Sequence, residues 1–155
     1  MDSLFAWIET TAVARATANS LALTAALSAI HLLGFTLVMG SAVLANLKRL
    51  GALLPTCSVA EVLRPANRAI LVGLAISAAT GALLFAARAT AVSANGMFQL
   101  KMLLLVTAAA FHFVVGRNDR AQDSVASPHT RVGAALSLAL WFALAVTACA
   151  FILLE

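Results

Sequence analysis

Four long runs of apolar residues divide the chain, and short polar segments separate them. The runs lie near residues 21–46, 69–92, 98–116 and 132–154. Each is close to the roughly 20 helical residues that cross about 30 Å of hydrocarbon. None alternates apolar and polar residues, as the strands of a membrane β-barrel do. Because a lipid-exposed backbone must close its hydrogen bonds internally, the pattern predicts an all-α integral membrane protein, a four-transmembrane-helix bundle.

Composition favours the bilayer as solvent. Of the 155 residues, 63% are hydrophobic and only 10% are charged, whereas soluble domains have roughly 45–50% apolar and about 25% charged residues. The length predicts a single membrane domain over residues 1–155. A sequence pI of about 10.1 is typical of proteins that bind nucleic acid. Here, however, the basic residues are scattered between the apolar runs, so we expect no nucleic-acid partner. Orientation in a lipid bilayer explains them better.

The basic residues also predict the topology. Seven of the ten lysines and arginines lie in the first and third connections, and an excess of such residues marks cytoplasmic loops. The second connection, "SANGMFQLK", is a short turn with Asn95-Gly96 as its breaker. Both termini are therefore expected on the outer side. The residues that set this orientation are Lys48, Arg49, Arg64, Arg68, Arg117, Arg120 and Arg131.

The first twenty residues predict an interfacial segment. They carry the acidic Asp2 near their start and have no basic n-region, so they do not resemble a cleavable signal. Ser3 is expected to cap a short helix, and tryptophan favours the membrane–water interface. We expect this helix to lie along the outer surface through Leu4, Phe5, Trp7 and Ile8.

A histidine lies deep in the first span. His31 shares one helical face with small and polar residues, while leucines form much of the opposite side. Ionisable side chains at membrane depth are costly and usually face the bundle interior. The pattern predicts that His31 points toward protein, on the face made by Thr24, Ser28, Phe35, Val38, Ala42 and Ala45.

The second span carries small residues and ends in an arginine. Gly73, Ser77 and Gly81 are four residues apart, a spacing that lets another helix approach closely. The same groove could instead admit a flat macrocycle, with Arg88 at its outer end to pair with a carboxylate. Close helix packing, and an Arg88 that snorkels to lipid phosphate, are the alternatives.

The third span carries a second intramembrane histidine. Lys101 and His112 lie on one face, since eleven residues make almost three whole turns. At 1.5 Å per residue, His31 lies about 15 Å and His112 about 21 Å below the outer boundary. Two imidazoles are a common axial pair for haem iron. These depths permit one shared haem without requiring it, and an inner-interface role for His112 stays open. His129, beside Pro128, is expected to be solvated.

Other chemistries have weaker signals. The chain has no phosphate-binding glycine loop, HExxH motif or paired-cysteine spacing. Met39, Met97 and Met102 could bind copper together with the histidines, although methionine more often fills a core. Cys57 falls in a connection and Cys149 in the last run, so we expect no disulfide.

The order of several motifs resembles a known family. An interfacial "LFAWIE", then "IHLLGFTLVMGSAVLANLKRLG", "TGALLFAARA" and "NGMFQLKMLLLVTAAAFHF" are similar to small bacterial four-helix membrane proteins of unknown function. In that family the first motif usually ends in Asp-Leu-Arg, where this chain has Asn46-Leu47-Lys48. The matching positions are His31, Thr80, Gly81, Asn95, Phe98, Lys101 and His112. The family looks distantly like copper-resistance protein D and small membrane cytochromes b, which implies haem or copper.

These observations favour a haem-b electron-transfer subunit of the bacterial cytoplasmic membrane. His31 and His112 would be axial ligands, and the chain would work between quinone and a partner protein rather than as a stand-alone enzyme. Gly73, Ser77 and Gly81 would make room for the ring, with Arg88 or Lys101 at the propionates. A copper-handling protein using His31 with Met39 or Met102, and a structural or assembly subunit of a larger complex, are the alternatives. A homo-oligomer is also compatible with the small residues on several faces.

Overall fold

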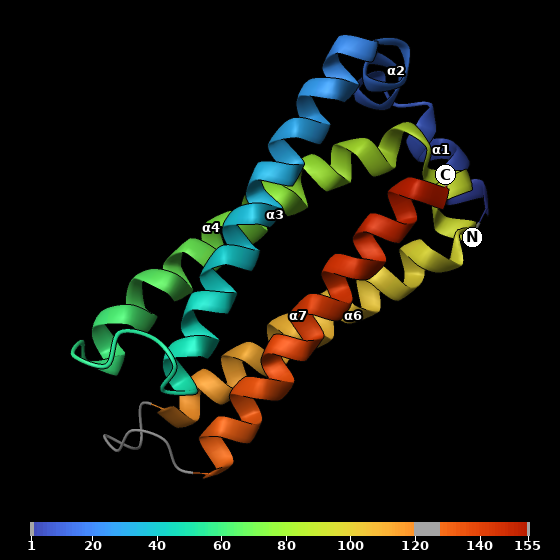
Figure 1. Ribbon diagram of the computed structural model, residues 1–155. Coiled ribbons are helices and arrows are strands. Elements are labelled where there is room, and N and C mark those ends of the chain that lie inside the picture. The colour runs from blue at the N-terminus through green and yellow to red at the C-terminus, as the bar shows by residue number, and fades with distance from the viewer. Residues whose placement is uncertain (1, 120–127, 155) are drawn as a thin grey trace. The chain divides into compact units, whose positions relative to one another are not determined.

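All regular structure in the part of the chain that the structure describes is helical, which confirms the predicted fold class. This computed structural model describes the backbone of residues 2–119 and 128–154. Arg120 and the other residues of 120–127 lie outside it. The helices are α1 (Asp2–Glu9), α2 (Ala12–Asn19), α3 (Leu21–Arg49), α4 (Val59–Ala87), α5 (Ala89–Ala94), α6 (Gly96–Asp119) and α7 (Pro128–Leu154), shown in Figure 1.

Four of these helices are long and apolar enough to cross a membrane: α3, α4, Gly96–Gly116 of α6 and Pro128–Phe151 of α7. The protein is therefore a multi-pass membrane protein. The second span begins at Val59 rather than near residue 69. Ser58 and Glu61 form a capping box there, in which each backbone N–H donates to the other's side chain, at 2.8 and 3.2 Å.

The predicted second span also ends earlier than expected. The helix stops at Ala87, and Arg88 has φ −144° and ψ 40°, which lies outside the helical region. The short helix α5 covers most of the remaining predicted length. A non-helical residue between them explains why a continuous apolar run gives two helices.

The chain contacts divide into two compact units. The first comprises Met1–Val38 and Leu71–Gly96, and the second comprises Met39–Ile70 and Met97–Glu155. Helices α3 and α4 each contribute one part to each unit. The prediction of one membrane domain over the whole length stays a prediction.

The first unit holds the N-terminal helix α1 against the C-terminal end of α4 and against α5. The rings of Phe5 and Phe85 meet edge to face at 6.0 Å, and the Thr90 backbone N–H donates to Glu9 Oε1 at 2.8 Å. Ser3 lies inside α1, which begins at Asp2, and so does not cap it. Trp7 is 64% exposed, and its place at the membrane interface stays a prediction.

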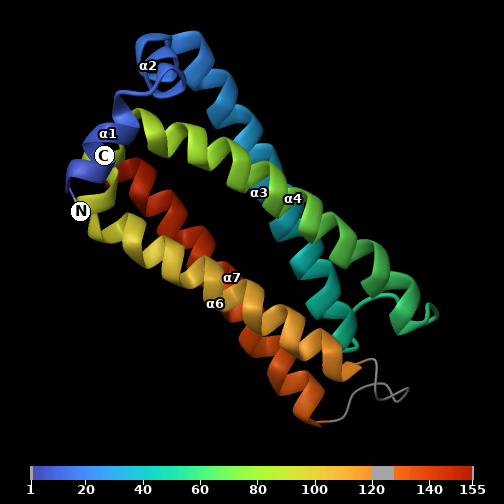
Figure 2. The ribbon, with the colours of Figure 1, turned by 180° about the vertical axis from the view of Figure 1, so that it is seen from behind.

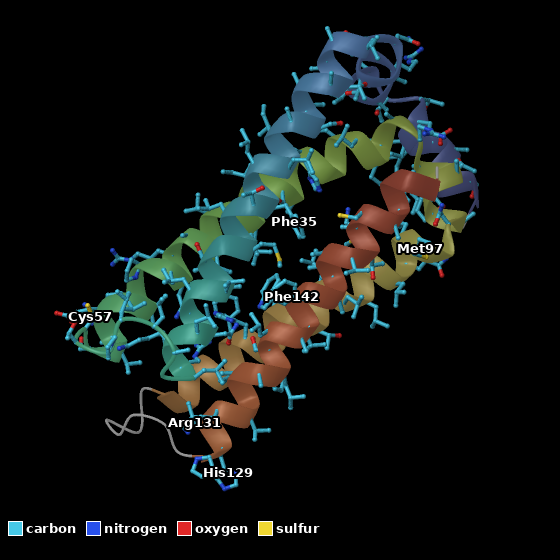
Figure 3. The ribbon with its side chains drawn as sticks, viewed as in Figure 1. Phe35, Cys57, Met97, His129, Arg131 and Phe142 are labelled. Carbon is cyan, nitrogen blue, oxygen red and sulfur yellow. The ribbon has the colours of Figure 1, made fainter. Side chains whose placement is uncertain are left out.

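In the second unit, α6 and α7 run side by side in both views (Figures 1 and 2). Its core contains Trp141 and Leu144 of α7 and Ile70 of α4, all buried. The connection between α3 and α4 carries Cys57, which Figure 3 shows there. Cys57 is half-buried and Cys149 is exposed on α7.

Candidate functional site

The face of α3 that carries His31 is turned toward protein, as the spacing predicts. Within the first unit, Val38 is 1% exposed and His31 itself is half-buried. Leu32 and Leu33 on the other side are 50% and 70% exposed. The apolar residues therefore meet lipid while the imidazole is directed away from it.

Three residues of α4 hold His31 in place, and we call Ser77, Thr80 and Gly81 the His31 cradle. Thr80 Oγ1 lies 3.1 Å from His31 Nδ1. Ser77 Oγ donates to the His31 backbone oxygen at 3.3 Å. A Cβ added to Gly81 would lie 3.0 Å from His31 Cε1. The ring is thus fixed by a hydrogen bond to Thr80 and by contact with Gly81.

The small residues predicted along α4 contact α3. A Cβ on Gly73 would lie 2.7 Å from the backbone oxygen of Gly34 and 2.8 Å from Val38 Cγ2. Gly73 therefore allows two backbones to approach, which is the packing alternative. That Gly73, Ser77 and Gly81 also make room for a macrocycle stays a prediction.

His112 lies in the second unit at the centre of a buried polar cluster. It is 0% exposed, and its Nε2 lies 3.0 Å from Asn67 Oδ1. Its Nδ1 lies 3.5 Å from Ser137 Oγ. Because an amide oxygen only accepts, Nε2 carries the proton and Nδ1 accepts from the serine hydroxyl. Both ring nitrogens of His112 are thus engaged by the protein.

Aromatic rings surround the same imidazole. Phe113 and Trp141 meet it edge to face, with centroids 5.6 and 6.2 Å away. Sequence reasoning missed Asn67, Ser137 and Trp141 as its neighbours. The available signal was Ser137, a single polar residue within an apolar run, with Trp141 one helical turn later on α7. Asn67 lies between Arg64 and Arg68 and carries no such signal.

The basic residues in the last turn of α3, Lys48 and Arg49, are buried. Lys48 Nζ donates to the backbone oxygens of Leu54 and Cys57, at 2.7 and 2.6 Å. Arg49 is 3% exposed and its Nη1 donates to Asn46 Oδ1 at 3.3 Å. Asn46, at the position predicted to be an aspartate in the family pattern, is therefore a neutral hydrogen-bond partner for Arg49.

The two cations predicted for propionates have different surroundings. Arg88 is exposed at the start of α5 in the first unit. Lys101 belongs to the second unit, where its Nζ lies 5.7 Å from the centre of the Phe151 ring, within range of a cation–π contact. His129 is exposed, as predicted, although it lies in the first turn of α7 rather than in a loop (Figure 3).

The two intramembrane histidines belong to different units. A haem shared between His31 and His112 therefore stays a prediction. Within residues 2–119 and 128–154, no three side chains of His, Cys, Asp or Glu gather in a group suited to a metal ion. The copper alternative stays a prediction that relies on methionine.

Comparison with known proteins identifies a family. A model described as "Family of unknown function (DUF6644)" matches residues 4–153, so the chain belongs to this family. This confirms the predicted resemblance to a family of unknown function. No curated protein and no solved structure matches the chain at a significant level. The distant likeness to copper-resistance protein D and to cytochromes b stays a prediction.

Proposed function

We propose that this member of the DUF6644 family is a haem-b-binding electron-transfer subunit of the bacterial cytoplasmic membrane. His31 would hold the haem iron. The bound haem supplies one-electron redox chemistry, and the chain passes electrons between the quinone pool and a partner protein. Both termini lie on the periplasmic side, in accord with the basic inner connections.

The observation that carries this proposal is the setting of His31. An imidazole within a membrane span is expensive and is usually functional. Histidines that bind metals almost always hydrogen-bond their second ring nitrogen to the protein, which fixes the ring. His31 has this arrangement, since Thr80 Oγ1 lies 3.1 Å from its Nδ1.

The remaining residues fit a haem to different degrees. Arg88, between α4 and α5, and Lys101, in the second turn of α6, are the cations that would pair with the propionates. His112 fits less readily as the second ligand, because its ring would have to release Asn67 or Ser137. The proposal therefore depends on His31 as the ligand. Whether His112 is the second ligand is tested by His112→Leu.

An absorption spectrum tests the proposal. The full chain is expressed with excess haem, purified in mild detergent, and its visible spectrum and metal content are measured. We expect a Soret band that His31→Ala removes and that His129→Ala retains, since His129 is exposed on α7. A colourless protein, or a band of equal height in His31→Ala, would overturn the proposal. Copper that is lost in His31→Ala would support copper handling instead.

A structural or assembly subunit is the second candidate, and the His112 cluster favours it. A fully buried imidazole whose two nitrogens are hydrogen-bonded across three helices holds those helices in one arrangement. This role predicts a metal-free protein that co-purifies with a larger membrane complex. His31→Ala would then leave that association unchanged.

A further inference from the structure

Two arginines lie four residues apart near the start of α4. The sequence there reads "RPANR", residues 64–68, and Arg64 and Arg68 are both exposed. Residues four apart in a helix are neighbours on one face, with about 5–6 Å between their Cβ atoms. Within residues 2–119 and 128–154, neither guanidinium group has a hydrogen bond or an ion pair. Helix α4 therefore presents two adjacent positive charges with which no acid of this part of the chain pairs.

The acid that precedes these arginines on α4 serves another purpose. Glu61 Oε2 accepts the Ser58 backbone N–H at 2.8 Å, as part of the capping box that begins the helix. Beside it the surface is hollowed, and an open recess of about 280 Å³ is lined by Ala60, Glu61, Arg64 and Pro65. Because Glu61 lines the recess, an anion is attracted most strongly on the side of Arg68, about two turns further along α4.

The exposed face of α4 becomes apolar directly after Arg68. Leu71 and Val72 are 55% and 53% exposed, and they follow Arg68 by about one helical turn. On a helix that crosses a membrane, exposed leucine and valine side chains contact acyl chains. Basic residues at the end of the apolar stretch then lie at the level of the lipid headgroups. The two arginines are thus placed where lipid phosphates are found.

We propose that Arg64 and Arg68 bind the phosphate group of an anionic phospholipid, whose acyl chains lie beside Leu71 and Val72. A guanidinium group presents parallel N–H donors that match two oxygens of a phosphate. In phosphatidylglycerol the phosphate charge has no counter-charge within the headgroup. In phosphatidylcholine a trimethylammonium group cancels that charge and repels the arginines. The site therefore selects anionic over zwitterionic lipids.

The apolar continuation of this face identifies a lipid, rather than a free phosphate ion, as the ligand. Inorganic phosphate would use the guanidinium groups but would gain nothing from Leu71 or Val72. The proposal requires only that α4 crosses the membrane. It does not rest on the haem function, so either can fail without the other.

Native mass spectrometry of the full chain, released from detergent micelles, measures this selectivity. The chain is titrated with phosphatidylglycerol, or with phosphatidylcholine that carries the same acyl chains. We expect the first phosphatidylglycerol to bind several-fold more tightly than the first phosphatidylcholine. Arg64→Gln and Arg68→Gln should each weaken phosphatidylglycerol binding by about fivefold, the effect of one basic residue near an anionic headgroup. Phosphatidylcholine binding should stay unchanged in both variants.

Arg15→Gln is the matched control, because Arg15 is also an exposed arginine but lies on α2. This variant loses the same charge and should bind phosphatidylglycerol as the wild type does. Helical circular dichroism shows that each variant is folded. Equal weakening in Arg15→Gln would reduce the effect to net charge and would overturn the site. A wild type without preference between the two lipids, or unchanged affinity in folded Arg64→Gln and Arg68→Gln, would do the same.

Two further results would assign the arginines to a different ligand. Displacement of phosphatidylglycerol by an equal concentration of inorganic phosphate would identify a free anion instead of a lipid. A wild-type dimer that both glutamine variants dissociate, with lipid binding unchanged, would make this face of α4 an interface between copies of the chain. Either result would overturn the lipid site.

Discussion

Gly34 and Gly73 mark a point where the backbones of α3 and α4 nearly touch. A Cβ on Gly34 would lie 3.0 Å from the Gly73 oxygen, and a Cβ on Gly73 would lie 2.7 Å from the Gly34 oxygen. The relationship is reciprocal: each glycine lacks a side chain at the point that the backbone of the other helix approaches. Between transmembrane helices such close packing is a main source of association.

Gly73→Ala is expected to destabilise the protein by about 1–3 kcal/mol, because the new methyl group meets backbone atoms that cannot move aside cheaply. The midpoint of denaturation in detergent measures this loss. Gly40→Ala is the control. An added Cβ on Gly40 meets nothing within 4 Å, so stability should hold or rise by up to about 1 kcal/mol through helix propensity. Equal effects of both substitutions would contradict the packing role of Gly73.

His112→Leu is expected to lower stability by about 1–3 kcal/mol, since Asn67 and Ser137 lose their partner in a buried site. The exposed His129→Leu should change stability little. If His31 alone anchors the cofactor, His112→Leu keeps a Soret band. Loss of the band from a folded variant would instead favour His112 as the second axial ligand.

Lys48→Met is expected to loosen the connection between α3 and α4. The ammonium group holds two backbone oxygens there, and hydrogen bonds to charged groups contribute about 1.5–3 kcal/mol. In a Cys149→Ala background, the rate at which a maleimide labels Cys57 reports the opening. We expect a several-fold faster reaction than in the wild type or in Arg64→Met, whose arginine is exposed. An unchanged rate would show that Lys48 does not hold the loop.

The orientation predicts that Cys57 faces the cytoplasm. A membrane-impermeant maleimide should label it in inverted vesicles and not in intact spheroplasts, with Cys149 replaced by alanine. Ala94→Cys, at the exposed end of α5, should show the reverse pattern when both native cysteines are replaced. The opposite result at both positions would invert the topology.

The helical fold was largely predictable from the hydropathy pattern. Long apolar runs leave no alternative to helices in lipid, so four spans and the short N-terminal helical segment followed from residue type alone. The orientation of His31 toward protein also followed, because the 3.6-residue period places it on the same helical face as Val38 and Ala42, which are both buried. The limits of the second span did not, since the capping box at Ser58 and the break at Arg88 are local effects that hydropathy averages out.

The partners of the polar residues could not be predicted. The sequence places His31 and His112 on inward faces, but several residues of the neighbouring helices were available to each. The rotation and register of helix packing selected Thr80 for the first and Asn67 with Ser137 for the second. Burial of Lys48 and Arg49 likewise depends on residues that come together only in the folded chain.

Residue type and order therefore determined which segments enter the membrane, because transfer into lipid depends on each segment by itself. Tertiary structure decided which hydrogen bonds form inside it, because those depend on how neighbouring helices pack.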